Sequence, residues 1–275
     1  MLESEYIWLE LTGDISIEAL TKLKKIYINE YRIYLATFCP SNFRRVLIDN
    51  DILLPKDVFK NMISLEFKEY TIRVSQALKE QGIELIGMLQ KGYPQSLREH
   101  EKCPVAIYLK SSKKEAGLKN IFMKIYKLYM LESKNEFNKE ILGYIWAKTI
   151  NKKKKKYMAA NTSMFDMIET KKIEAFGCEY IGVCKTGDIE IYILNRDNRY
   201  VDKEKLLLCI IDGLIVGRVS NTKRCIDVVD FVLEGDRDIF AVPGNILYKE
   251  NYLANHLIKQ GAYIVTNRYD MEHLI

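Results

Sequence analysis

The chain has 275 residues, of which 48% are hydrophobic and 29% charged, so it is long enough and apolar enough to bury a core and is not a disordered protein. Its formal net charge of +5 is compatible with a polyanionic partner, but many ordinary soluble proteins are as basic. No apolar run approaches the roughly 20 residues of a membrane span, and an N-terminus with Glu3 and Glu5 lacks a signal pattern. We therefore expect a cytoplasmic protein without membrane contact.

The first 80 residues favour a compact all-α module. Ile17, Leu20, Leu23 and Ile26 recur at the three- and four-residue spacing of an amphipathic helix, and Ser16 just before them is a suitable N-cap. Further helices are predicted at residues 42–48, 55–62 and 65–81. We expect a domain boundary near residue 80, with a second domain over 81–275.

After Gly82 the pattern changes to alternating strands and helices. Strands are predicted at 83–88, 103–109, 121–128, 157–160, 180–183, 189–194, 214–216, 239–242 and 263–265. Helices are predicted at 138–149, 165–176, 203–209, 222–233 and 252–260. This alternation predicts an α/β fold with a mostly parallel sheet and helices on both faces. Five lysines, Lys152 to Lys156, separate a predicted helix from a predicted strand, and we interpret them as a solvated loop.

The cysteines and histidines do not indicate a metal or a cofactor. The six cysteines include no CxxC pair, and none of the three histidines is spaced with a cysteine as a zinc ligand would be. The three histidines lie at scattered positions, and we recognise no nucleophile–base constellation with serine or cysteine. We expect free thiols in a reducing compartment and no enzymatic activity.

Several motifs, in order, resemble the DprA/Smf family of DNA-processing proteins. GYPQSL (Gly92–Leu97) and CPVAIY (Cys103–Tyr108) are similar to the family's "YP..L……P..LY" pattern. IFAVPGN (Ile239–Asn245) resembles its "vFAVPG" strand and turn, and NHLIKQGA (Asn255–Ala262) its "N.LI..GA". The resemblance covers nearly the whole chain. It implies a small all-α, SAM-like N-terminal module followed by a Rossmann-like domain.

The resemblance also implies a function. Proteins of this family bind single-stranded DNA without catalysing a reaction, act as homodimers, and load a RecA-type recombinase onto DNA taken up in natural transformation. Their Rossmann-like domain holds phosphates with glycine-rich turns and basic side chains. Unpaired N–H groups and the positive end of a helix favour an anion at such places.

This chain departs from the family at those glycine-rich turns. Tyr129–Ser133, which follows the strand predicted at 121–128, has no glycine where the family has "GSR". The segment aligned with "SGlA.GID" keeps only Asp166. Lys203-Glu204-Lys205 stands in place of "RNR", and Lys223–Val229 in place of "SGSL.TA".

The candidate phosphate-binding residues therefore fall into three groups. Lys203 and Lys205 lie at one predicted helix start, and Lys223 and Arg224 lie at another, where cations oppose the helix dipole unless an anion is bound. The third group is Pro243, Gly244 and Asn245, in the turn where open α/β sheets place ligands. A purely structural turn and solvated side chains explain the same residues. Asp166 is interpreted as a helix N-cap.

Two other functions remain open. A degenerate family member that had lost DNA binding would act as a protein-interaction scaffold. A nucleotide hydrolase on a related scaffold would carry a glycine-dense "PGG.GT..E" loop, which residues 243–246 do not supply.

Overall fold

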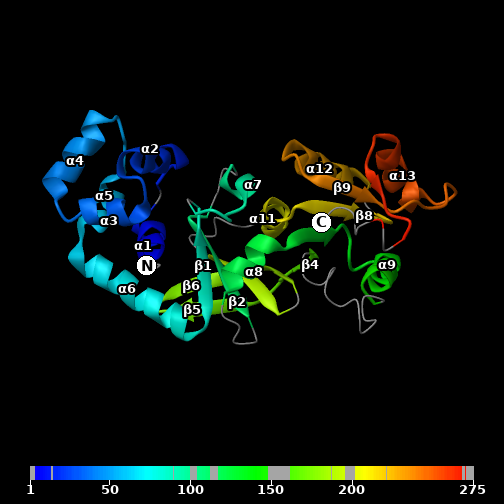
Figure 1. Ribbon diagram of the computed structural model, residues 1–275, viewed down its shortest axis with the longest axis horizontal. Coiled ribbons are helices and arrows are strands. Elements are labelled where there is room, and N and C mark those ends of the chain that lie inside the picture. Colours follow the sequence, from blue (N-terminus) through cyan, green and yellow to red (C-terminus); the bar gives the residue numbers. More distant parts are fainter. Residues whose placement is uncertain are drawn as a thin grey trace. The chain divides into compact units, whose positions relative to one another are not determined.

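A computed structural model of the chain describes residues 4–13, 15–88, 90–99, 104–111, 117–147, 162–186, 188–195, 202–220, 222–267 and 270 (Figure 1). The chain forms two compact units. The first comprises Met1–Lys119, Thr170–Gly182 and Ile191–Val201. The second comprises Asn120–Glu169, Val183–Glu190 and Asp202–Ile275. The predicted strand at 157–160 and the five lysines lie outside the described residues.

The first unit begins with helices, as the sequence predicted. They are α1 (Ser4–Thr12), α2 (Ile17–Tyr27), α3 (Glu30–Ala36), α4 (Pro40–Asp49), α5 (Lys56–Ile63) and α6 (Leu65–Glu80). The predicted cap of α2 is confirmed, because the Ser16 hydroxyl accepts the N–H of Ala19 at 3.1 Å. Helices α1 and α3 were not predicted. Helix α1 is buried on nearly all sides, so it lacks the one-sided apolar period on which the prediction depended.

The strands of the first unit are β1 (Ile83–Gly87), β2 (Ala106–Ser111), β5 (Lys172–Ala175) and parts of β6 (Cys178–Thr186) and β7 (Ile189–Leu194). Their order is β1-β2-β7-β6, with β5 paired to β6. The β1–β2 and β5–β6 pairs are antiparallel. The helix predicted at 165–176 is therefore wrong. Ile173 and Ala175 are buried while Lys172 and Glu174 are exposed, which is the alternation of a strand.

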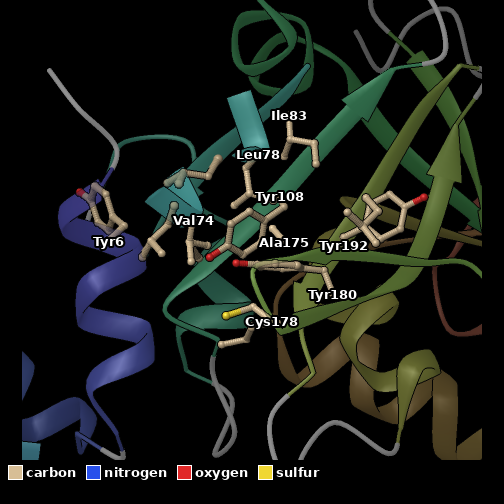
Figure 2. Close-up of a cluster of buried hydrophobic side chains, with 14 residues drawn as sticks. Tyr6, Val74, Leu78, Ile83, Tyr108, Ala175, Cys178, Tyr180 and Tyr192 are labelled. Atoms are coloured by element: carbon tan, nitrogen blue, oxygen red, sulfur yellow. The ribbon is translucent and has the colours of Figure 1, made fainter. Parts of the chain in front are cut away.

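One hydrophobic core joins the helices and strands of this unit (Figure 2). Val74 and Leu78 of α6 pack in the same cluster as Tyr108 of β2 and Tyr180 of β6. The two tyrosine rings meet edge to face with centroids 4.6 Å apart. Because this core extends from α6 into β1 and β2, the compact unit continues past the boundary predicted near residue 80. The division of the chain into domains of residues 1–80 and 81–275 stays a prediction.

The GYPQSL motif (Gly92–Leu97) lies in the segment between β1 and β2 and helps to hold that segment in place. The Tyr93 hydroxyl donates to the carbonyl of Pro104 at 2.5 Å and links the two parts of the motif. The short helix α7 (Gln95–Arg98) begins directly after Pro94. Tyr93 is buried and packs the segment, as the sequence indicated.

Lys68 of α6 is buried without a hydrogen-bond partner among the described residues. Only 2% of the residue is exposed, and its Nζ lies 3.6 Å from the centroid of the Phe38 ring and 5.2 Å from that of Tyr34. Burial lowers the pKa of this amine to about 8. The rings offset part of the desolvation through cation–π attraction but supply no acceptor.

We expect Lys68→Met to raise the free energy of unfolding at pH 7 by about 1–3 kcal/mol, because it removes an unpaired buried amine and keeps the apolar stem. The difference from wild type should narrow above about pH 8. There the folded amine becomes neutral while the unfolded one stays protonated, so wild-type stability rises. Urea denaturation at pH 7 and pH 9 measures both effects. Exposed Lys60→Met is the control, and a destabilised Lys68→Met protein would contradict the interpretation.

The second unit is built on five parallel strands. They are β3 (Tyr126–Met130), β4 (Thr162–Met167), β8 (Gly213–Val216), β9 (Asp238–Ala241) and β10 (Tyr263–Ile264). Their order in the sheet is β4-β3-β8-β9-β10, and all four pairings are parallel. The carboxyl end of β4 also pairs with β6 in antiparallel register, Asp166 opposite Lys185. Leu128, Met130, Ile215, Phe240 and Val265 form the core.

When these five strands are numbered 1 to 5 in chain order, their order across the sheet is 2-1-3-4-5, which is a doubly wound arrangement. The helices are α9 (Glu136–Ala147), α11 (Lys203–Ile210), α12 (Thr222–Glu234) and α13 (Tyr252–Lys259). Right-handed crossovers in opposite directions place α9 on one face of the strands and α12 and α13 on the other (Figure 1). The predicted α/β, Rossmann-like fold is confirmed.

The strand predicted at 121–128 is only partly correct, because helix α8 (Leu118–Lys124) precedes β3. The start of α8 is capped by a side chain distant in sequence. The backbone N–H groups of Gly117, Leu118 and Lys119 donate to the Glu84 carboxylate at 2.9–3.2 Å. No local pattern reveals such a cap. In the described part of the chain, no helix is long and apolar enough to cross a membrane.

Candidate nucleic-acid interface

The strand order of the second unit reverses between β3 and β8, which is where open α/β sheets bind ligands, at the carboxyl ends of the strands. Asn138 of α9, fully buried, joins the two loops that leave these strands. Its Nδ2 donates to the carbonyls of Leu131 and Glu132 at 3.1 and 3.2 Å and to that of Arg218 at 2.8 Å. Its Oδ1 accepts the Arg218 N–H at 3.0 Å. One amide thus fixes both loops.

Gly217 shows how closely these loops approach. A Cβ atom at this position would lie 2.5 Å from Asn138 Oδ1 and 2.9 Å from Met130 Cε. Only glycine therefore leaves room for the buried amide beside β8. The reversal point is a rigid, close-packed place rather than an open glycine-rich turn.

Glu132, directly after β3, places a carboxylate at the start of α12. Its oxygens accept the Ser220 N–H at 2.7 Å, the Ser220 hydroxyl at 2.9 Å and the Cys225 thiol at 3.6 Å. Burial, with Glu132 beside it, raises the pKa of Cys225 to about 12, so the thiol stays a donor. A helix start favours an anion, and here the protein supplies that anion itself. The sequence analysis did not single out Glu132.

The four predicted cations come from two helix starts that the structure brings together. Arg224 in the first turn of α12 pairs with Glu204 of α11 at 2.5 Å, and this hydrogen bond raises the pKa of the guanidinium. Lys203 Nζ donates to the carbonyls of Ile168 and Glu169, just after β4, at 3.0 Å each. These two side chains are engaged within the unit. Lys205 and Lys223 flank them and are exposed.

The turn after β9 is bound to α13. The N–H of Gly244 donates to Asn255 Oδ1 at 3.1 Å, and Asn255 Nδ2 donates back to the Gly244 carbonyl at 2.9 Å. Asn251 Nδ2 donates to the Asn245 carbonyl at 3.0 Å, and a Cβ on Gly244 would lie 2.2 Å from Asn251 Cγ. Pro243 is exposed. The backbone of Gly244 is thus engaged by the protein's own amides, as a structural turn requires.

Asp166 takes another place than the sequence predicted. Asp166 lies in β4 rather than at a helix start, so it caps no helix, because the segment forms strands. The loop after Asn245 is strongly exposed and apolar, with Ile246 88% and Leu247 82% accessible. Tyr248 follows it and is also exposed.

Arg218 is a candidate residue that the sequence analysis missed. It follows β8 by two positions, at the reversal point, and its guanidinium carbon lies 3.7 Å from the Phe137 ring centroid and 5.4 Å from that of Tyr248. Its Nε is buried and finds no hydrogen-bond partner among the described residues. The only sequence signal for this residue was its position in a Gly-Arg pair directly after a short strand. The structure shows that all four residues of that strand are buried.

Among the residues that the structure describes, no group of three or more His, Cys, Asp or Glu side chains is arranged to hold a metal ion. No protein-family model matches the chain, and no curated protein matches it. The X-ray structure of DNA processing protein A (DprA) from Streptococcus pneumoniae is similar to this chain. The two have 15% sequence identity and a TM-score of 0.43, and the match covers 94% of this chain and 98% of that one.

Proposed function

We propose that this chain is a non-catalytic, DprA/Smf-like DNA-processing protein that binds single-stranded DNA at the carboxyl edge of its parallel strands. The observation that carries the proposal is the meeting of the α11 and α12 starts. The Arg224–Glu204 pair joins them, and Lys205 and Lys223 of the same two helix starts are exposed. Exposed lysines at one edge attract phosphates and release the counterions that surround a nucleic acid.

Exposed aromatic side chains near this edge support binding of an unpaired strand. Val219 donates its N–H to the Glu250 carbonyl at 3.0 Å, so residues 248–252 adjoin the loop after β8. Tyr252 is 67% exposed, and its ring stacks on His256 with centroids 6.0 Å apart. Tyrosine faces stack on unpaired bases irrespective of sequence, whereas bases in a duplex are covered by their neighbours.

The proposal includes the partners and setting implied by the sequence resemblance. The protein would act in the cytoplasm as a homodimer and deliver single-stranded DNA to a RecA-type recombinase during natural transformation. Its role would be binding and positioning rather than turnover. Co-sedimentation of the chain with a recombinase, with and without DNA, tests the partner separately from DNA affinity.

We expect the purified chain to bind a fluorescein-labelled 20-nucleotide oligothymidine at low salt and to bind the same label on a duplex more weakly. Fluorescence anisotropy measures both. The duplex is the control for charge alone, since it carries more phosphates per unit length. Absence of binding to the single strand at low salt would overturn the proposed function.

A second candidate, a protein-interaction module without DNA binding, is favoured by the exposed loop of Ile246 and Leu247 and by the Glu132 carboxylate at the α12 start. An exposed apolar patch is typical of a docking surface. Charge reversal of the two exposed lysines, Lys205 and Lys223, separates the two candidates in cells. Unchanged transformation by that variant would favour the interaction module.

A further inference from the structure

We infer that Arg218 is the central phosphate-binding residue of the second unit and holds one phosphate group of a nucleic acid at the point where the strand order reverses. For the identity of the ligand the inference rests on the proposed function. It goes beyond the proposed function, which names only the cations at the two helix starts. It assigns a phosphate contact to Arg218, which follows strand β8.

In the part of the chain that the structure describes, no carboxylate or carbonyl pairs with the charge of Arg218, whereas the other described arginines of this unit have such partners. Arg224 is paired with Glu204. Arg237 donates from Nε and both Nη atoms to the carbonyls of Val232, Leu208 and Phe231. Arg218 has neither a carboxylate nor a carbonyl partner for its guanidinium among the described residues, and its Nε is buried. A part-buried guanidinium whose charge is left unpaired is costly, so an anion that accepts from it is favoured.

The surroundings fix the guanidinium before any ligand arrives. The backbone of Arg218 is held on both sides by Asn138, through its N–H at 3.0 Å and its carbonyl at 2.8 Å. The planar head lies over Phe137, with Tyr248 at 5.4 Å. A preset, weakly hydrated fork loses little freedom when it binds, and its geometry matches two oxygens of a phosphate.

The other candidate anion donors near Arg218 are already occupied by the protein's own groups. Glu132 already accepts the Ser220 N–H at the start of α12, so that helix start does not offer its usual anion site. Gly244, at the end of the next strand, also has its N–H engaged, by Asn255. Of the loops that leave β3, β8 and β9, the one after β8 therefore presents the unpaired donor.

The position of Tyr248 favours a nucleotide over free phosphate as the ligand of Arg218. Its ring is close to the guanidinium and about half exposed, and Lys249 follows it in the sequence. A base can stack on such a ring while its phosphate meets the arginine. Inorganic phosphate also meets the arginine, but it has no base to stack on the ring.

The test is a titration of the full chain with labelled oligothymidine, in competition with thymidine monophosphate and with inorganic phosphate. We expect Arg218→Gln to weaken oligonucleotide binding about 10- to 100-fold and to reduce the salt slope by about 0.7. Arg218→Lys should restore part of the affinity, because it keeps the charge and loses the fork. Arg44→Gln is the matched control, since Arg44 also lies over a ring, Phe59 at 5.0 Å, in the first unit. Circular dichroism confirms that each variant is folded.

The outcomes separate this inference from the proposed function. If wild type binds the oligonucleotide and Arg218→Gln binds it equally with the same salt slope, the inference is overturned and the proposed function stands. If wild type binds only thymidine monophosphate or phosphate, and Arg218→Gln abolishes that binding, Arg218 is a phosphate site and the DNA function falls. No binding by wild type to any of the three overturns both.

Discussion

Replacing Asn138 by alanine should lower the free energy of unfolding by about 3–5 kcal/mol. The side chain is fully buried and satisfies the carbonyls of Leu131, Glu132 and Arg218 as well as the Arg218 N–H. Alanine leaves these backbone groups unpaired inside the protein, and each costs about 1–3 kcal/mol before the loops relax. Urea denaturation followed by circular dichroism measures the loss.

The matched control is Asn50→Ala. Asn50 makes one side-chain hydrogen bond, to the Val46 carbonyl, on an exposed helix end, so we expect a change below about 0.5 kcal/mol. Asn138→Asp should destabilise the protein at neutral pH at least as much as Asn138→Ala, because it keeps the acceptor for Arg218 but sets a buried carboxylate against three carbonyl oxygens. An Asn138→Ala protein within about 1 kcal/mol of wild type would show that this amide does not hold the reversal point together.

Reversing the charge of the two exposed lysines at the helix starts should weaken binding of single-stranded DNA by about 100-fold or more. Lys205→Glu/Lys223→Glu removes two cations and adds two anions at one edge, and each charged hydrogen bond is worth about 1.5–3 kcal/mol. Lys203 and Arg224 are left in place, because they are engaged within the unit and their loss would disturb its packing. Anisotropy with the labelled oligonucleotide measures the effect.

The chain offers a control with the same change of charge at the opposite edge. Lys124 ends α8 just before β3, and Lys259 ends α13 just before β10, so both lie at the amino ends of the parallel strands. Both are exposed. Lys124→Glu/Lys259→Glu should bind nearly as wild type does. Equal weakening in the two double variants would indicate that net charge alone, rather than the carboxyl edge, governs binding.

The elements with a strong local pattern could be predicted from the sequence. Strand β7 runs from Ile189 to Leu194 as expected, and α12 begins at Thr222 as expected. The doubly wound class followed from the alternation of such elements. Helix α1 escaped prediction because it is buried all round, and α8 because Glu84, more than 30 residues earlier, caps its start.

The candidate site could be predicted only to the level of the sheet edge. Sequence placed Lys203 and Arg224 at helix starts, which is correct, but their partners depend on the fold. Glu204 reaches Arg224 from another helix, and the Ile168 carbonyl reaches Lys203 from the end of β4. The same holds for Gly244, whose acceptor and donor come from Asn255. Tertiary contacts decide which cations remain available, so Arg218 became evident only from the structure.

The most direct test of the central claim is the salt dependence of oligothymidine binding by the wild-type chain. Each phosphate contact with a single strand contributes about −0.7 to the slope of log K against log salt. With Arg218, Lys205 and Lys223 as contacts, we predict a slope of about −2, falling to about −0.7 in Lys205→Glu/Lys223→Glu. Binding with a slope near zero, or no binding at the lowest salt, would contradict a phosphate-binding edge on this protein.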